Sequence, residues 1–251
     1  MSVTLAQPIV FAGGSAITQG FSLGSPPTAG NLIVVGFSGN DNGIAPGTMT
    51  SLFADSSPPQ SAVYTAYRRV QGGDLAGPYT WTGLIAGWDA GGFIAELAGA
   101  GTPTVWAEGS GTWTLAGTTQ VANGTVNTLA GSMIFELYVI YTAASTIAQS
   151  ASDAISQSFA IVNHGPLATS ASSKQYQLIA TRSDGSPSTA NPVATMPNVT
   201  TANGLQSQFG IVIPAAAVSG TVGNGSVASC IGNTNIPVFA DLLKRRYQSC
   251  L

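Results

Sequence analysis

The chain has 251 residues, of which 7% are charged, and its formal net charge is -3. Globular proteins usually carry about 25% charged residues, so little charge repulsion separates two copies of this chain, and we expect its faces to meet other subunits. The negative charge gives no positive field for phosphates, and no apolar run reaches the roughly 18 residues of a membrane span, so neither nucleic acid nor membrane is expected as a partner.

Strand-forming residues recur along the chain between clusters of Gly, Pro, Asn and Ser. In chain order, the predicted strands are 31–37, 63–70, 92–97, 104–108, 112–116, 132–141, 176–182 and 208–213. Turn signals such as Gly72-Gly73, Asn123-Gly124 and Asp184-Gly185 separate them. Strands that follow turns without intervening helices predict an all-β protein with an antiparallel β-sandwich.

The predicted strand 132–141 carries apolar residues on both of its faces. Side chains alternate across a strand, so Met133, Phe135, Leu137, Val139 and Tyr141 share one face, and Ile134, Glu136, Tyr138 and Ile140 share the other. A strand that is apolar on both sides is predicted to lie at the centre of the fold.

The composition changes after residue 213. Three alanines at 215–217 lead into a Gly- and Ser-rich stretch, and the end of the chain carries Asp241 followed by Lys244, Arg245 and Arg246. An acid before a basic cluster is the charge order that a helix dipole favours. We therefore expect a β-sandwich over 1–217 and a C-terminal arm over 218–251 that ends in a short helix.

Several short runs have a form that is known from one family. They are Ala29-Gly30-Asn31-Leu32-Ile33-Val34-Val35-Gly36, Phe53-Ala54-Asp55-Ser56, and the run 92–99 that ends in Glu, Leu, Ala and Gly. In the second half, 129–135 and 208–214 have the form of a second such strand and of a closing strand. Together these runs resemble the concanavalin A-like jelly-roll domains of phage and prophage virion proteins.

The resemblance covers about residues 5–217. It departs from the family at Gly131, where the family usually has Glu, and the family has no counterpart for the arm after residue 217. The resemblance implies a jelly-roll sandwich that serves as a virion structural protein, in capsid decoration, a collar, or a tail or fibre. Its expected partners are other copies of itself and other virion proteins.

Residues for nucleophilic catalysis are scarce. His164 is the single histidine, and its turn-like neighbours include no acid, so we expect a surface-loop histidine rather than a triad member. The run Gly20-Phe21-Ser22-Leu23-Gly24 has the spacing of a nucleophile elbow, but prolines follow at once where that motif needs a helix.

The sequence also gives little support for catalysis by paired carboxylates or for metal binding. Glu96, Glu108 and Glu136 could supply a glycosidase pair, but no clustered motif accompanies them. The run Asn40-Asp41-Asn42-Gly43 lacks the Glu that closes a calcium loop. We expect no catalytic residue, no metal and no cofactor, with a glycosidase as the weakest alternative.

Two groups of residues are candidates for binding. The aromatic residues Trp81, Trp88, Trp106 and Trp113 could stack on a host surface glycan, lie in the core, or anchor a subunit interface. The basic cluster Lys244, Arg245 and Arg246 could dock the arm onto an acidic neighbour or form a solvated helix end. A carbohydrate-binding module for host attachment is therefore the main alternative function.

The remaining features concern location and redox state. The first 21 residues lack the basic region of an export signal, so the chain is expected to be made in the host cytoplasm and to reside in the virion. Cys230 and Cys250 fit neither a disulfide scaffold nor a metal cluster. Free thiols are expected, and a bridge between the two remains open.

Overall fold

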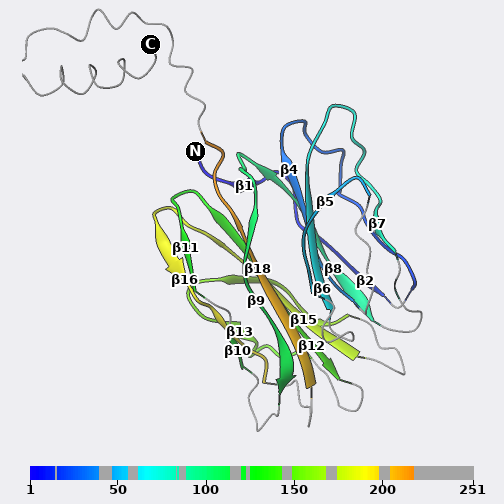
Figure 1. Cartoon of the computed structure of the whole chain (residues 1–251), viewed down its shortest axis with the longest axis vertical. Coiled ribbons are helices and arrows are strands. Elements are labelled where there is room, and N and C mark those ends of the chain that lie inside the picture. Colours follow the sequence, from blue (N-terminus) through cyan, green and yellow to red (C-terminus); the bar gives the residue numbers. More distant parts are fainter. Residues whose placement is uncertain are drawn as a thin grey trace, which may run out of the picture. The chain divides into compact units, whose positions relative to one another are not determined.

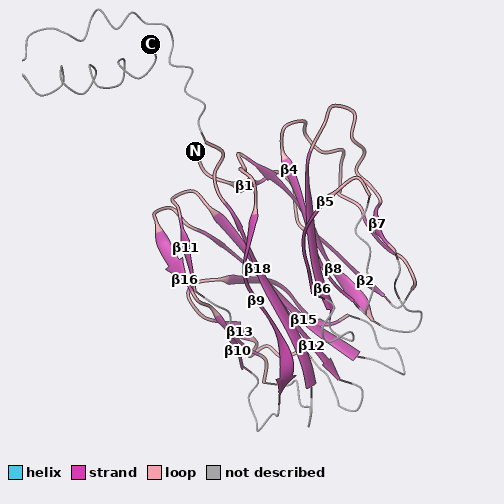
Figure 2. Ribbon diagram, viewed as in Figure 1, coloured by secondary structure: helices cyan, strands magenta, loops and turns pink. Residues whose placement is uncertain are grey.

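A computed structural model describes residues 1–14, 16–39, 47–55, 62–82, 84, 89–113, 120–122, 125–142, 149–167, 174–197 and 204–217. Every regular element in these ranges is a β-strand, and the strands pair in antiparallel sheets (Figure 2). The all-β class and the β-sandwich predicted from the sequence are therefore confirmed. The predicted arm and its helix at 218–251 lie outside the described residues.

The first main sheet comes entirely from the N-terminal part of the chain. Its strands are β1 (Thr4–Leu5), β2 (Val10–Gly14), β4 (Leu32–Gly39), β5 (Thr50–Asp55), β6 (Ala62–Arg69) and β8 (Ala90–Ala98). They lie in the order β1-β8-β4-β6-β5, and β2 pairs with β8 beside β1 (Figure 1).

The second main sheet comes from the remainder of the chain. Its strands are β9 (Thr104–Trp113), β12 (Met133–Thr142), β14 (Ala160–Pro166), β15 (Lys174–Ser183) and β18 (Gly204–Ile213), in the order β14-β15-β12-β18-β9. Figure 1 shows the two main sheets as facing layers of the sandwich.

Three small sheets complete the fold. In the first, β3 (Gln19–Phe21) pairs with β7 (Tyr79–Trp81), and in the second, β11 (Val126–Thr128) pairs with β16 (Ser188–Ala190). The third contains β10 (Gln120–Ala122), β17 (Val193–Thr195) and β13 (Ala154–Ile155), in this order across the sheet. Residues of these strands bury the outer faces of the main sheets.

The core has an inner layer between the main sheets and an outer layer behind each of them. Phe135 and Leu137 of β12 point into the inner layer, whereas Ile134 and Tyr138 point into the outer layer behind the second sheet. The ring of Phe135 stacks on Phe93 of β8, with centroids 5.1 Å apart, and so joins the two sheets. Strand β12 is central, as its apolar faces predicted.

One predicted boundary is wrong. The sequence predicts two strands at 104–108 and 112–116, but β9 runs without a turn from Thr104 to Trp113. The glycines at 109 and 111 pair with Gln208 and Gln206 of β18, so pairing along a long neighbour holds a segment that local composition marks as a turn. Long-range pairing therefore overrides the local signal here.

The finer jelly-roll assignment is not confirmed. A jelly roll is wound from two Greek keys across two sheets. Here each main sheet takes all of its strands from one half of the chain. All the described strands belong to one compact unit, Met1–Ala217.

Candidate functional site

The structure places the first of the four candidate tryptophans in the core. Trp81 lies on β7, is 1% exposed, and stacks on the ring of Phe37 with centroids 4.9 Å apart. Its ring is therefore not open to a glycan at the surface of this chain. Trp106 and Trp113 lie on β9 with side chains outside the described part, and Trp88, Lys244, Arg245 and Arg246 lie outside the described residues.

Two of the three glutamates considered as a carboxylate pair lie on opposite outer faces of the sandwich. Glu96 on β8 and Glu136 on β12 each precede a leucine that points into the inner layer. Both main sheets therefore separate the two carboxylates, and packed sheets lie about 10 Å apart, which exceeds the roughly 5–9.5 Å of a glycosidase pair. The side chain of Glu108 is outside the described part.

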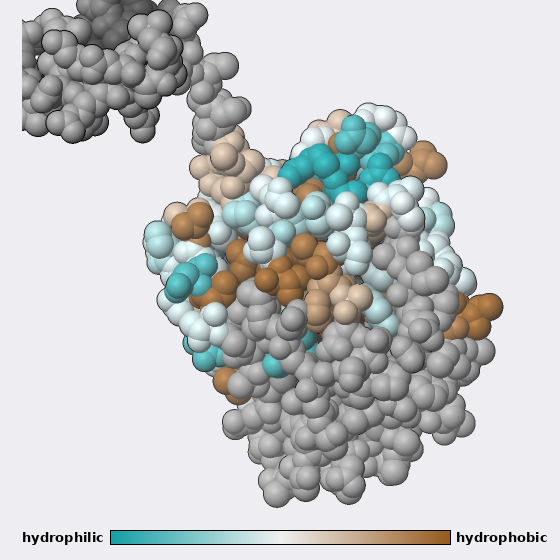
Figure 3. Space-filling view, viewed as in Figure 1, coloured by the Kyte–Doolittle hydropathy of each residue, from teal (hydrophilic) through white to brown (hydrophobic). Residues whose placement is uncertain are grey.

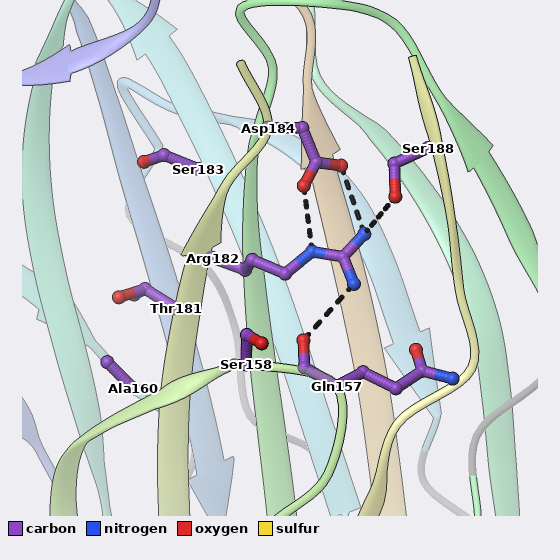
Figure 4. Close-up of a pocket in the computed structure, with 8 residues that line it drawn as sticks. All are labelled: Gln157, Ser158, Ala160, Thr181, Arg182, Ser183, Asp184 and Ser188. Atoms are coloured by element: carbon purple, nitrogen blue, oxygen red, sulfur yellow. Dashed lines mark hydrogen bonds and ion pairs between the residues drawn. The ribbon is translucent and has the colours of Figure 1, made fainter. Parts of the chain in front are cut away.

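One candidate site is an open pocket of about 460 Å³ on the outer side of β15 (Figure 4). Figure 4 shows Arg182 at the centre of the lining residues, with Asp184 and Ser188 beyond one end of its guanidinium and with Gln157 and Ser158 on the opposite side. The pocket thus combines the second main sheet, one of its covering strands, and the segment before β14.

Arg182 is held by several partners in this pocket. Its Nε lies 2.8 Å from Asp184 Oδ1, and its Nη2 donates to Asp184 Oδ2 at 3.0 Å and to Ser188 Oγ at 3.2 Å. Thr128 Oγ1 also donates to Asp184 Oδ2. The guanidinium carbon lies 5.0 Å from the centre of the Phe159 ring. Arginine and aspartate charges cancel here, so the pocket is polar without a net charge.

The backbone at one side of the pocket has an uncommon conformation. Gln157 and Ser158 have φ values of 61° and 60°, although neither is glycine. Such residues are destabilised by about 1–3 kcal/mol each and are enriched at binding and catalytic sites. The Gln157 carbonyl accepts a hydrogen bond from Arg182 Nη1 at 3.3 Å, and its side-chain oxygen accepts one from Asn191 N at 2.6 Å, which hold the segment in place.

A second arginine pocket, of about 280 Å³, lies on the outer side of β6. Arg68 Nη2 lies 2.7 Å from both oxygens of Asp74, and Thr48 and Tyr79 also line the pocket. The neighbouring Arg69 instead donates to the carbonyl of Ala100 at 2.8 Å. The two arginines therefore leave the strand on different sides, as side chains do at successive positions of a strand.

The expectation that His164 lies in a surface loop without an acid partner is wrong. His164 is on strand β14, and its Nδ1 lies 2.6 Å from Asp153 Oδ2. Its Nε2 lies 3.0 Å from Gln149 Nε2, and the hydroxyl of Tyr176 donates to the same carboxylate oxygen of Asp153. Asp153 is eleven residues away in sequence, and the fold of 149–167 brings it to the histidine.

The Asp153 carboxylate also affects Tyr176. Burial raises the pKa of the Tyr176 hydroxyl, and the hydrogen bond to Asp153 raises that pKa further. Tyr176 therefore stays protonated and acts as a donor that ties β15 to the segment before β14. The group thereby connects β14, β15 and the segment before β14.

Glu96 forms the third polar group. It is 2% exposed, and it accepts hydrogen bonds from Asn31 Nδ2 at 2.6 Å, from Thr28 N at 2.7 Å and from Gln7 Nε2. Burial acts to raise its pKa, but the hydrogen bonds from Asn31, Gln7 and Thr28 outweigh burial and lower the pKa below its usual value. The carboxylate is therefore charged, and it holds three separate segments together.

Sequence reasoning missed the Arg182 pocket. In the sequence, Asp184 is recognisable only as part of the turn Asp184-Gly185. No pattern of neighbouring residues connects Arg182 with Gln157 or Ser188. The one available signal was the spacing of Arg182 and Asp184, which puts both side chains on the same face of a strand.

No family model, no curated protein and no solved structure matches the chain. Within the described ranges, no group of three or more His, Cys, Asp or Glu side chains could hold a metal ion. The same ranges contain no helix with the length and apolar character that a membrane crossing requires. The candidate calcium run 40–43 lies outside the described residues.

Proposed function

We propose that this chain is a structural protein of a bacteriophage particle, located in capsid decoration, a collar, or a tail or fibre, which acts by binding copies of itself and other virion proteins. The observation that carries the proposal is the use of its few charged groups. Glu96, Asp153 and the Arg182–Asp184 pair each tie together segments of the sandwich. Charged groups that are engaged in contacts within the chain contribute little repulsion between copies of it, which suits a protein that assembles with others.

The surface supports the same proposal. Large apolar side chains are exposed on the described part, and they are Met1, Leu5, Ile17, Leu75 and Leu129. Figure 3 shows apolar residues gathered on the viewed face between β1 and β18. Exposed apolar groups on a chain with 7% charged residues favour contact with other protein surfaces over free solution.

Particle incorporation tests this proposal. In a host that produces the particles, mass spectrometry of purified particles is expected to detect the full chain and to lose it when 218–251 is deleted. Replacing Lys244, Arg245 and Arg246 by Gln is expected to reduce incorporation, whereas replacing both arginines by Lys keeps the charge and serves as the matched control. Absence of the full chain from particles would refute the proposal.

A carbohydrate-binding role is the second candidate, and the Arg182 pocket favours it. The pocket volume of about 460 Å³ lies in the range of small-molecule sites, and its lining, which has no net charge, offers both donors and acceptors, as sugar hydroxyls require. Gln157→Gly removes a lining side chain and suits the local φ of 61°. If neutral oligosaccharides bind the parent chain and bind this variant at least tenfold more weakly, the second role gains support; an equal affinity opposes it.

A further inference from the structure

The two main sheets have the same strand connectivity. In chain order, the first contains β1, β4, β5, β6 and β8, together with β2, which pairs with β8 on the same edge as β1, and the second contains β9, β12, β14, β15 and β18. In each, the first strand pairs with the last, the last with the second, the second with the fourth, and the fourth with the third. Five strands can be ordered in many ways, so an identical order in both sheets points to a common plan.

The covering strands follow the same plan. Strand β3 precedes the second strand of its sheet, and it pairs with β7, which lies between the fourth and last strands. Strand β11 precedes the second strand of the other sheet, and it pairs with β16, which again lies between the fourth and last strands. Each pair contributes to the apolar layer behind its own main sheet.

The pairing register agrees residue by residue. Arg68 lies opposite Ile33 in the first sheet, and Arg182 lies opposite Ile134 in the second. The last strand of each sheet extends the match. Phe93 of β8 lies opposite Gly36, and Phe209 of β18 lies opposite Leu137. Gly36 and Leu137 each stand three residues after the matched isoleucine of their own strand. By this register Ile33 corresponds to Ile134, Arg68 to Arg182, and Phe93 to Phe209.

An irregularity is repeated at the same position. The pairing of β5 with β6 shifts just after Ser51, which lies opposite Ala66. The pairing of β14 with β15 shifts just after Ile161, which lies opposite Ala180. Both alanines precede the matched arginine by two residues. A bulge is a local feature of one strand pair, so its recurrence at a matched position is strong support for a repeat.

The turn that leads into the second strand is also repeated. Gly30 and Gly131 have φ values of 88° and 81°, and each follows an alanine. Gly30 N donates to Val70 O at 3.0 Å, and Gly131 N donates to Asp184 O at 2.6 Å. Val70 and Asp184 each stand two residues after the matched arginine. Left-handed backbone is uncommon outside glycine, which explains why glycine is kept at both positions.

We infer that residues 1–99 and 102–217 are two copies of one folding unit, and that the inner face of each is a surface whose fitting partner is a second copy of the same unit. The sandwich is then a dimer within a single chain. Two such copies meet through the same face, as in a two-fold symmetric dimer. The segments that leave the two copies meet in an antiparallel bridge between Ala100 and Ala215, and a two-fold axis perpendicular to the strands gives this direction.

The repeat places the two arginine pockets at corresponding positions. Thr48 and Ser158 each stand two residues before the start of a matched strand, at Thr50 and Ala160, and each lines the pocket of its own copy. Each matched arginine pairs with an aspartate that follows it in the chain, but Asp74 stands six residues after Arg68 and Asp184 only two after Arg182. The repeat therefore matches the position of the arginine on each outer face, and the aspartate differs between the two pockets.

Circular permutation of the whole chain tests this inference. The boundary permutant runs 102–251 and then 1–101, so it breaks the chain between the copies and keeps all 251 residues. The control permutant runs 73–251 and then 1–72, so it breaks the exposed turn at Gly72-Gly73 inside the first copy and uses the same new join. The control break falls between two exposed glycines, where cuts are best tolerated, and the boundary break falls between the half-buried Gly101 and the exposed Thr102.

Thermal unfolding followed by circular dichroism gives the result. The boundary permutant is expected to melt within about 5 °C of the parent, and the control permutant at least about 10 °C lower, because only the control separates strands of one copy. A boundary permutant that fails to fold, or that melts no higher than the control, would overturn the inference. The outcome does not depend on any role in a virion.

Discussion

Replacing Glu96 by Gln is expected to destabilise the sandwich markedly. Three donors surround the carboxylate, from Asn31 at 2.6 Å, from Thr28 at 2.7 Å and from Gln7. A glutamine keeps one acceptor oxygen but turns an NH₂ group toward a donor. Hydrogen bonds to charged groups contribute about 1.5–3 kcal/mol each, so we expect a loss of about 2–4 kcal/mol and a fall in melting temperature of roughly 4–16 °C.

The loss is expected to depend on pH. The folded pKa of Glu96 lies below its ordinary value, so the charged carboxylate stabilises the fold above the unfolded pKa, and this contribution disappears as the pH falls through the folded pKa. The difference in unfolding free energy between the parent and Glu96→Gln should therefore be largest near neutral pH and should shrink in acid.

Urea unfolding of both proteins between about pH 3 and pH 7 measures this difference. Gln7→Ala serves as a graded control, because it removes one donor and leaves the carboxylate with two. It should lose less stability than Glu96→Gln. Equal stability of Glu96→Gln and the parent at neutral pH, or a difference that does not change with pH, would refute the reasoning.

Three further substitutions test the packing and the polar groups. Gly36→Ala would place a Cβ 2.3 Å from the ring of Phe93 and 2.9 Å from the ring of Phe209, so calorimetry should show that the free energy of unfolding falls by about 1–3 kcal/mol. The control Gly72→Ala meets nothing within 4 Å and should leave stability unchanged. Arg182→Met leaves the buried carboxylate of Asp184 without its cation, and urea unfolding should show a loss of about 3–5 kcal/mol; a neutral result would contradict the buried ion pair. His164→Ala removes one hydrogen bond from a buried carboxylate and should lower stability by about 1–3 kcal/mol in the same assay, while a free surface histidine would show no change.

Much of the fold could be predicted from the sequence because burial leaves a local pattern. The alternation at 132–141 identified the central strand, since both of its faces are packed. The strands of the small sheets are short, such as Ser188–Ala190, and such segments leave little periodicity. The repeat was missed because the two copies share few identical residues, although they share register.

The candidate sites were less predictable because they are made by contacts between distant segments. Asp153 reaches His164 through a turn, and Gln157 reaches Arg182 across 25 residues. Local reasoning placed His164 in a loop because Gly165 and Pro166 follow it, whereas pairing with β15 keeps this segment in a strand. The tryptophans show the same limit, since composition cannot distinguish the core position of Trp81 from a surface platform.

The most direct test of the proposed assembly role is the mass of the purified full chain in solution as a function of concentration. Light scattering after size exclusion should give a multiple of 25.2 kDa that persists on dilution, because a chain with few charges and exposed apolar residues is expected to bind its own copies. A mass of 25.2 kDa at every concentration, together with absence of the chain from purified particles, would contradict the account.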